Sequence, residues 1–418
     1  MAYLVITILI IGLYTIKRRS LLNATFLFAA PYVFIILLNN NVMVNLGYFS
    51  IKETTFRVLL IFTVGLAIGS VIQMAFKKRV RFSIESSDLG SYISDRSISK
   101  INTFLWFVII IRIFNILLSI RSVGLAALYA NDFEALQLSG LIGHITLLGT
   151  ALVPYVYKHY LKNKNARDLI VILAYCGVLF ASFVKYHVII LIIVLFFEYG
   201  FFYPQKIIKA FIILFGSTLI LFVGNYWLSF ILRSINFSSA FAISKVWTYV
   251  AGGTITNDVL LQTESNSYSM GQWLLSIPSG IVNLFSSVIV GKPIIENVGW
   301  GHVIIGQTSI QAYWTNVYSQ LTYLSQYSNI LEMIATSIII GFAGEASIPS
   351  TSESDDSYTK PTRLFILSFI FLNFFSNYFS LSSSWEIIGW SMLSGIIIRS
   401  LPHLVVGNKR GNQMNYHE

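Results

Sequence analysis

The sequence predicts an all-α polytopic membrane protein of about 11 transmembrane helices, with one large outer loop that contains short interfacial helices. Composition is the first reason: hydrophobic residues make up 55% of the 418 residues and charged residues only 11%, whereas soluble domains carry about 25% charged residues. Mean hydropathy is +0.71. The second reason is that apolar runs recur along the chain, and about 20 apolar residues are enough for a helix to cross the bilayer.

The first apolar run, residues 2–16, is followed rather than preceded by basic residues, so we interpret it as a short first span and not as a signal peptide. Ten further runs complete the predicted set of spans. They cover residues 21–38, 56–76, 101–120, 141–157, 169–184, 188–203, 207–227, 330–344, 364–379 and 387–398.

The long stretch between the eighth and ninth spans has no convincing span. Within it, residues 270–290 are apolar but interrupted by Pro278 and several Ser and Gly residues, so we expect an interfacial or re-entrant helix there. The predicted organisation is therefore an N-terminal membrane bundle of eight spans at 1–228, a large extracytoplasmic loop at 229–329, three C-terminal membrane helices at 330–398, and a cytoplasmic tail at 399–418.

The basic residues predict the orientation. When alternate loops are assigned to alternate sides, twenty of the 28 Lys and Arg residues lie on one side and seven on the other, and Arg112 remains inside a span. Because cytoplasmic loops carry the excess of basic residues, the N-terminus is expected outside and the C-terminus in the cytoplasm. The net charge of +10 follows from these clusters, so we expect no nucleic-acid partner.

Arg112 is the first candidate for a binding role, because an arginine at the level of the hydrocarbon is costly and normally faces a partner or a wet cavity. Arg121 lies at the outer end of the same span, Lys185 lies in the short outer turn between the sixth and seventh spans, and Arg233 follows the eighth span. These four cations are predicted to bind a diphosphate, whose oxygens match the donors of a guanidinium group. The alternative is ordinary anchoring at the membrane interface.

Few residues on the predicted outer side can transfer a proton. His302 is the only histidine in the large loop, and imidazole accepts and donates protons near neutral pH. Asp258 and Glu296 are carboxylates of the same loop, and His144, near the outer end of the fifth span, is a rival to His302. His302 is therefore the first candidate for a catalytic base, with Asp258 and Glu296 as further candidates. The alternative is that His302 is structural or simply exposed, which is more common for a single histidine in a loop.

The large loop holds four of the eight tryptophans, and aromatic rings can stack against the apolar faces of sugars or line the membrane interface. Trp300, Trp314, Asn316 and Tyr318 are the candidate sugar-binding residues. No Walker loop, dinucleotide-binding motif, HExxH or Cys/His cluster occurs. The sequence therefore predicts no metal site and no cofactor.

Two short motifs of the loop resemble the O-antigen polymerase family, also described as oligosaccharide repeat-unit polymerases. One is Tyr249-Val250-Ala251-Gly252-Gly253 followed by Asp258, which resembles the family's Tyr-x-x-Gly-Gly stretch. The other is Thr315-Asn316-Val317-Tyr318, which is similar to an Asn-Val-Tyr-Thr segment. The resemblance also covers the general organisation of spans, basic inner loops and one dominant late outer loop.

The resemblance implies a metal-independent glycosyltransferase of the bacterial plasma membrane that builds O-antigen (lipopolysaccharide) or capsule-type polysaccharide. The growing glycan would leave its undecaprenyl diphosphate carrier and join the next lipid-linked repeat unit at the outer face of the membrane. The implied partners are this lipid-linked oligosaccharide, the lipid bilayer, and a chain-length regulator and a flippase of the same pathway. A lipid-linked oligosaccharide flippase, an O-antigen ligase and a non-catalytic scaffold remain alternatives.

Overall fold

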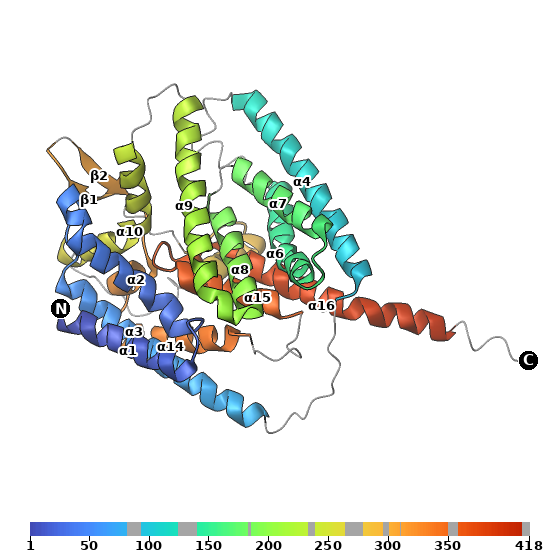
Figure 1. Ribbon diagram of the computed structural model, residues 1–418, viewed down its shortest axis with the longest axis horizontal. Helices are drawn as coiled ribbons and strands as arrows, with labels where there is room; N and C mark the ends of the chain where they lie inside the picture. Colours follow the sequence, from blue (N-terminus) through green and yellow to red (C-terminus); the bar gives the residue numbers. More distant parts are fainter. Residues whose placement is uncertain are drawn as a thin grey trace, which may run out of the picture. The chain divides into compact units, whose positions relative to one another are not determined.

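The computed structural model describes residues 1–81, 93–123, 140–182, 185–232, 239–263, 279–295, 301–309, 311–349 and 358–411. Within these residues the protein is mainly helical (Figure 1). A helix lies at each of the eleven predicted runs. These helices are α1 (Ala2–Arg18), α2 (Ala24–Asn41), α3 (Glu53–Arg81), α4 (Asp95–Val123), α6 (Gly140–Asn163), α7 (Ala166–Ala181), α8 (Lys185–Phe202), α9 (Ile207–Leu232), α14 (Ile330–Ser347), α15 (Lys360–Leu372) and α16 (Ser382–Gly411).

Five of the described helices are long and apolar enough to cross a membrane, which identifies the chain as a membrane protein. These segments are Ala24–Asn41, Glu53–Phe76, Asp95–Ser122, Gly140–Asn163 and Ile330–Ser347. Tyr186–Phe202 and Ser279–Ile289 are apolar but shorter. The total of eleven crossing helices stays a prediction.

The chain forms two compact units, and each contains segments that are distant in the sequence. Unit 1 consists of Met1–Ser86, Ser217–Ile348 and Ile366–Trp385, and unit 2 consists of Ser87–Gly216, Pro349–Phe365 and Glu386–Glu418. α9, α15 and α16 each contribute residues to both units. The division predicted from the sequence, at residues 228, 329 and 398, separates membrane spans from loops rather than compact units, and it stays a prediction.

Unit 1 is built around the close pairing of α3 with α14. Gly65 and Gly69 of α3 face Ser337 and Ile338 of α14 so closely that a Cβ at either glycine would overlap the partner helix. Ser70 Oγ also donates to the backbone oxygen of Gly341, at 3.2 Å. Small residues spaced four apart allow two helix backbones to approach in this way.

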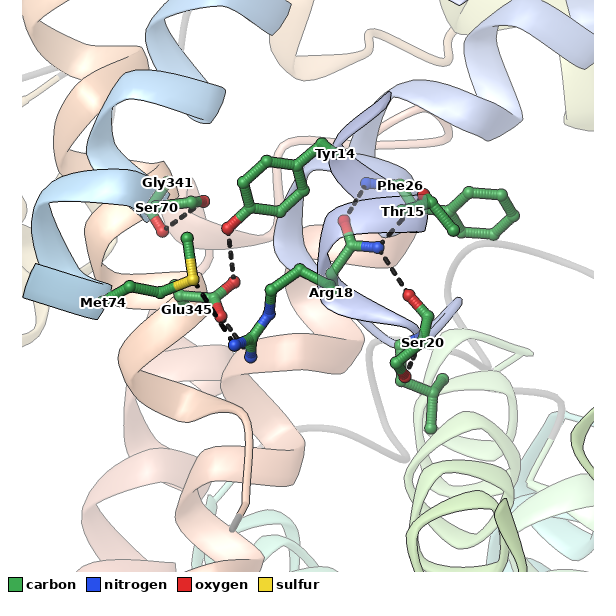
Figure 2. Close-up of polar contacts among 11 residues, drawn as sticks. Tyr14, Thr15, Arg18, Ser20, Phe26, Ser70, Met74, Gly341 and Glu345 are labelled. Carbon is green, nitrogen blue, oxygen red and sulfur yellow. Dashed lines mark hydrogen bonds and ion pairs between the residues drawn. The ribbon is translucent and has the colours of Figure 1, made fainter. Parts of the chain in front are cut away.

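An ion-pair cluster joins α1 to this helix pair (Figure 2). Arg18 forms an ion pair with Glu345, whose side chain is 2% exposed, and Tyr14 donates to the same carboxylate at 3.2 Å. Arg18 also contacts Met74 of α3. Because a buried carboxylate without a partner is strongly unfavourable, this cluster fixes the position of α1 against α14.

The three helices α1, α3 and α14 run in the same direction. The amino group of Met1 pairs with Glu53 at the start of α3, while Arg18 meets Met74 near its end. α14 runs in the same direction as α3. The first half of α14 faces Gly65 of α3, and Phe342 in its second half contacts Phe76, which is closer to the end of α3. The starts of all three helices therefore lie at one end of unit 1.

The segment that the sequence assigned to short interfacial helices contains more structure than expected. It includes α10 (Ser239–Thr263), α12 (Ser279–Ile289), α13 (Gln320–Tyr327) and an antiparallel hairpin of β1 (Val303–Gln307) and β2 (Ala312–Thr315). α10 has 25 residues and packs against α2, α3, α13 and both strands. Its apolar residues are interspersed with Thr and Asn, so no span was predicted from its sequence.

The hairpin attaches to the turn between α2 and α3, which includes the short helix η1 (Met43–Leu46). Phe49 donates to the backbone oxygen of Ile305 at 3.0 Å, and Gln307 donates to that of Gly47 at 2.7 Å. The rings of Tyr48 and Tyr313 stack with centroids 4.5 Å apart. Gly47 has a φ of 94° and Gln307 lies close to it, so both its conformation and the space require glycine.

Unit 2 is built from α4, α6, α7 and α8, with η3 (Pro204–Lys206) after α8. At the end where α4 begins, the fully buried Asp168 accepts from His159 (2.6 Å) and from Asn102 (2.8 Å). α15 joins the unit through a buried ion pair between Lys360 and Glu198, at 2.8 Å.

The last two predicted spans differ from the expected ranges. α15 ends at Leu372, whereas the predicted run continued to residue 379. The chain after it forms turns and the short helix η4 (Tyr378–Ser380) before α16 begins. Tyr32 donates to the backbone oxygen of Asn373 at 2.7 Å, so this interruption is held by α2.

Candidate functional site

Arg112 is the most deeply buried cation among the described residues, with 2% of its surface exposed. It lies on α4, and its Nη2 donates to the hydroxyl of Ser182, 2.5 Å away, just after α7. Ser182 in turn donates to the backbone oxygen of Val178 at 2.8 Å. A guanidinium group is thus held at the end of α7, next to the turn that leads into α8.

Two further polar side chains lie within the electrostatic range of Arg112. His187, in the first turn of α8, is 3% exposed. It interacts electrostatically with the guanidinium group of Arg112, and so does Tyr175 on α7. Tyr175 is anchored to α6, since its hydroxyl donates to the backbone oxygen of Thr146 at 2.5 Å. Arg112 therefore lies in a polar region between α4, α6, α7 and α8.

The other three predicted diphosphate-binding cations are placed differently. Arg121 is exposed in the last turn of α4, nine residues after Arg112, which puts it about 14 Å along the helix and on the opposite face. α4 therefore does not bring these two arginines together. Lys185 is the first residue of α8, beside the Arg112 region, but its side chain is outside the described part. Arg233 lies outside the described residues.

Asp258 is buried in unit 1 and holds the start of α3. Its carboxylate accepts from the backbone N–H of Lys52 and from the hydroxyl of Thr55, both at 2.8 Å, and from Gln262 at 2.5 Å. Lys52 Nζ also donates to Gln262. Burial raises the pKa of Asp258 above its usual range, although the hydrogen bonds oppose the shift. These contacts give Asp258 the geometry of a helix-capping residue.

The two motifs that resemble the polymerase family lie against each other in unit 1. A Cβ on Gly252 of α10 would lie 2.7 Å from Thr315 Oγ1, and one on Gly253 would lie 2.9 Å from the backbone nitrogen of Ser319. Ser319 Oγ donates to the backbone oxygen of Gly253 at 3.1 Å. The two glycines are therefore required for the close approach of these segments.

The sugar-binding candidates that the structure describes lie next to this contact. Trp314 on β2 is 50% exposed, and Asn316 is also exposed in the segment that follows β2. The hydroxyl of Tyr318 donates to the backbone oxygen of Gly301. His302 follows Gly301 directly and is exposed. Trp300 and Glu296 lie outside the described residues.

The predicted site residues are divided between the two units. Arg112, Arg121 and Lys185 belong to unit 2, whereas Asp258, His302, Trp314, Asn316 and Tyr318 belong to unit 1.

Sequence reasoning missed the carboxylate partner of His144. Nδ1 of this histidine lies 2.6 Å from Oε1 of Glu386, 242 positions later in the chain. Both residues belong to unit 2. In the sequence, His144 and Glu386 share only their position in the first turns of two apolar helices. This shared position does not show that the two side chains form a pair.

No family model matches the chain, and no curated protein or solved structure matches it at a significant level. The apolar helices define the class of the chain as a helical membrane protein.

Proposed function

We propose that the protein is a polymerase of lipid-linked oligosaccharides, which transfers a growing glycan from its polyprenyl diphosphate carrier to the next lipid-linked repeat unit at the outer face of the bacterial plasma membrane. The observation that carries the proposal is the burial of Arg112 in a polar region formed by four apolar helices. A cation in this environment is retained at a free-energy cost, so a functional role is the first hypothesis.

In the proposed reaction a hydroxyl of the acceptor sugar attacks the anomeric carbon of the donor. The bond from this carbon to the diphosphate breaks, and the diphosphate leaves with the electron pair. Arg112 binds the diphosphate and stabilises the charge that develops on it, with Lys185 as the second cation. Arg121, on the opposite face of α4, is left out of this set, and Arg233 keeps its predicted role.

The segment around Trp314, Asn316 and Tyr318, with Trp300, keeps its predicted role in binding sugars. Two observations support this assignment: Trp314 and Asn316 are exposed, and the hairpin that carries Trp314 is fixed by the turn between α2 and α3. The base that accepts the proton is sought among His302, Asp258 and Glu296. Of these, Asp258 is engaged in capping α3.

Deleting the gene and analysing lipid-linked and surface glycans tests the proposal. Without a polymerase, single repeat units should still reach the surface, and long polymer should disappear. A flippase mutant would retain single units inside the cell, and a ligase mutant would accumulate long polymer on the carrier. Either of these results would exclude the polymerase assignment.

Arg112 is tested in the same assay. Arg112→Ala should lower polymer formation by about 10²- to 10³-fold at equal protein level, since it removes a charge-stabilising donor. Arg112→Lys should retain part of the activity, because lysine keeps the charge without the bidentate fork. Arg57→Ala is the matched control, as Arg57 is an exposed arginine in the first turns of α3. Normal polymer with Arg112→Ala would exclude a catalytic role for Arg112.

A further inference from the structure

His144 and Glu386 form a dyad at the start of two helices of unit 2. His144 lies in the second turn of α6, and Glu386 lies in the second turn of α16. Nδ1 of the imidazole and Oε1 of the carboxylate are 2.6 Å apart. The same carboxylate oxygen accepts from Trp390 Nε1 at 2.9 Å. Glu386 is therefore fixed on two sides, by its own helix and by α6.

The dyad differs in exposure between its two members. The side chain of Glu386 is 14% exposed, whereas that of His144 is 57% exposed. Because Nδ1 pairs with the carboxylate, the neutral imidazole carries its proton on Nδ1 and a lone pair on Nε2. A buried carboxylate that orients an exposed imidazole is the arrangement of a general base. An ion pair that only joins two helices does not need an exposed imidazole.

In the described part of the chain, His302 has no such orienting group. His302 is exposed, and its side chain forms no hydrogen bond or ion pair with any residue that the structure describes. His144 also belongs to the same unit as Arg112. It precedes Thr146, the residue to which Tyr175 is anchored, by two residues, which is about 3 Å along α6 and about 200° around it, so the two side chains lie on different faces of α6.

We propose that His144, oriented by Glu386, is the proton acceptor of the glycosyl transfer, in place of His302. Nε2 takes the proton of the acceptor hydroxyl as its oxygen bonds to the anomeric carbon, and the diphosphate departs with the electron pair. The imidazolium then returns its proton to water. Glu386 is a positioning residue, since it acts through the imidazole. This inference rests on the proposed function and adds the base to it.

A matched control lies on the same helix. His159 also pairs through Nδ1 with a buried carboxylate, Asp168, at the same distance of 2.6 Å. It is fifteen residues after His144, about 22 Å away along α6. His159→Gln therefore disturbs a comparable pair at the other end of the helix, where no role in the reaction is proposed.

The experiment uses right-side-out membrane vesicles from cells that make the repeat unit, with each variant expressed in the deletion strain and compared at equal protein level. His144→Gln should lower polymer formation by about 10²- to 10⁴-fold, the usual contribution of a positioned base, whereas His159→Gln should keep it. Added imidazole should restore polymer formation to His144→Gly. The rescue should be weaker in a His144→Gly/Glu386→Gln protein, which has lost the orienting carboxylate.

The outcomes separate the inference from the proposed function. Suppose that polymer is lost in the deletion strain. Normal polymer in His144→Gln, or no imidazole rescue in His144→Gly, would then contradict the role of His144 and leave the proposed function standing. Normal polymer in the deletion strain overturns the proposed function. If His144 variants do not accumulate, Trp390→Phe removes one hydrogen bond from Glu386 and should lower polymer formation by about two- to tenfold; an unchanged rate would contradict the inference.

Discussion

At the scale of single residues, the structure assigns a definite environment to Asp258. The sequence offered it as a substitute base, and the structure shows a carboxylate that caps α3. The structural role of this carboxyl group can be tested by its effect on the stability of the protein, without an activity assay.

We predict that Asp258→Asn destabilises the protein by about 1–3 kcal/mol, because Asn replaces one carboxyl oxygen with an NH2 donor and so leaves one of the buried donors without an acceptor. The pKa of Asp258 is raised by burial, so the folded protein binds the proton more tightly than the unfolded chain does. The contribution of Asp258 to stability is therefore greatest when it is protonated, and falls as pH rises from the usual aspartate range through the raised pKa.

Thermal unfolding of the purified protein in detergent, measured across the acidic pH range, tests whether the contribution of Asp258 to stability falls as pH rises. The difference in melting temperature between the wild type and Asp258→Asn should shrink as pH rises. A difference that grows with pH would contradict the raised pKa.

At the scale of elements, the pairing of α3 with α14 depends on glycine. A Cβ at Gly69 would overlap the backbone oxygen of Ile338, which cannot move away independently of α14. Hydropathy identified both helices correctly as apolar, but it could not pair them. The spacing of Gly65 and Gly69 is the sequence signal that was available for this contact.

We predict that Gly69→Ala destabilises unit 1 by about 1–3 kcal/mol through overpacking. Gly12→Ala on α1 is the control, since a Cβ there would meet no atom within 4 Å, and it should be neutral or slightly stabilising. The resistance of the purified variants to thermal unfolding measures both effects. Equal melting temperatures for the two variants would show that α3 and α14 do not approach as closely as described.

Helix α10 shows the limit of pattern reasoning at this scale. Its polar residue Asn257 is buried, and Asn257 bonds to Thr55 and Ser325, which are far from it in the sequence. A helix with buried polar side chains has no clear apolar face, so its sequence predicts neither a span nor a surface helix.

At the scale of the whole molecule, the common direction of α1, α3 and α14 makes a prediction about sidedness. If these helices cross the bilayer, Met1, Glu53 and Ile330 lie at one side, and the hairpin contacts the turn at this same end. The distribution of Lys and Arg predicts that this side is the outside.

Cysteine labelling of intact cells tests this arrangement. In a Cys176→Ala background, which removes the lone cysteine, a membrane-impermeant maleimide should label Gln307→Cys directly and Lys17→Cys only after permeabilisation. Both positions are exposed. Labelling of both from the same side would contradict either the parallel arrangement or the membrane crossing of α1.

The sequence by itself determined the class of protein and the position of its apolar helices, because the length and composition that a bilayer demands are local properties of the chain. It also indicated Arg112, because a charge within an apolar run is visible without any structure. Only the tertiary structure decided which groups meet: Arg112 with Ser182, Asp258 with Lys52, and His144 with Glu386. Such pairs join residues far apart in the chain, and their distances follow from how whole helices pack, which no local pattern encodes.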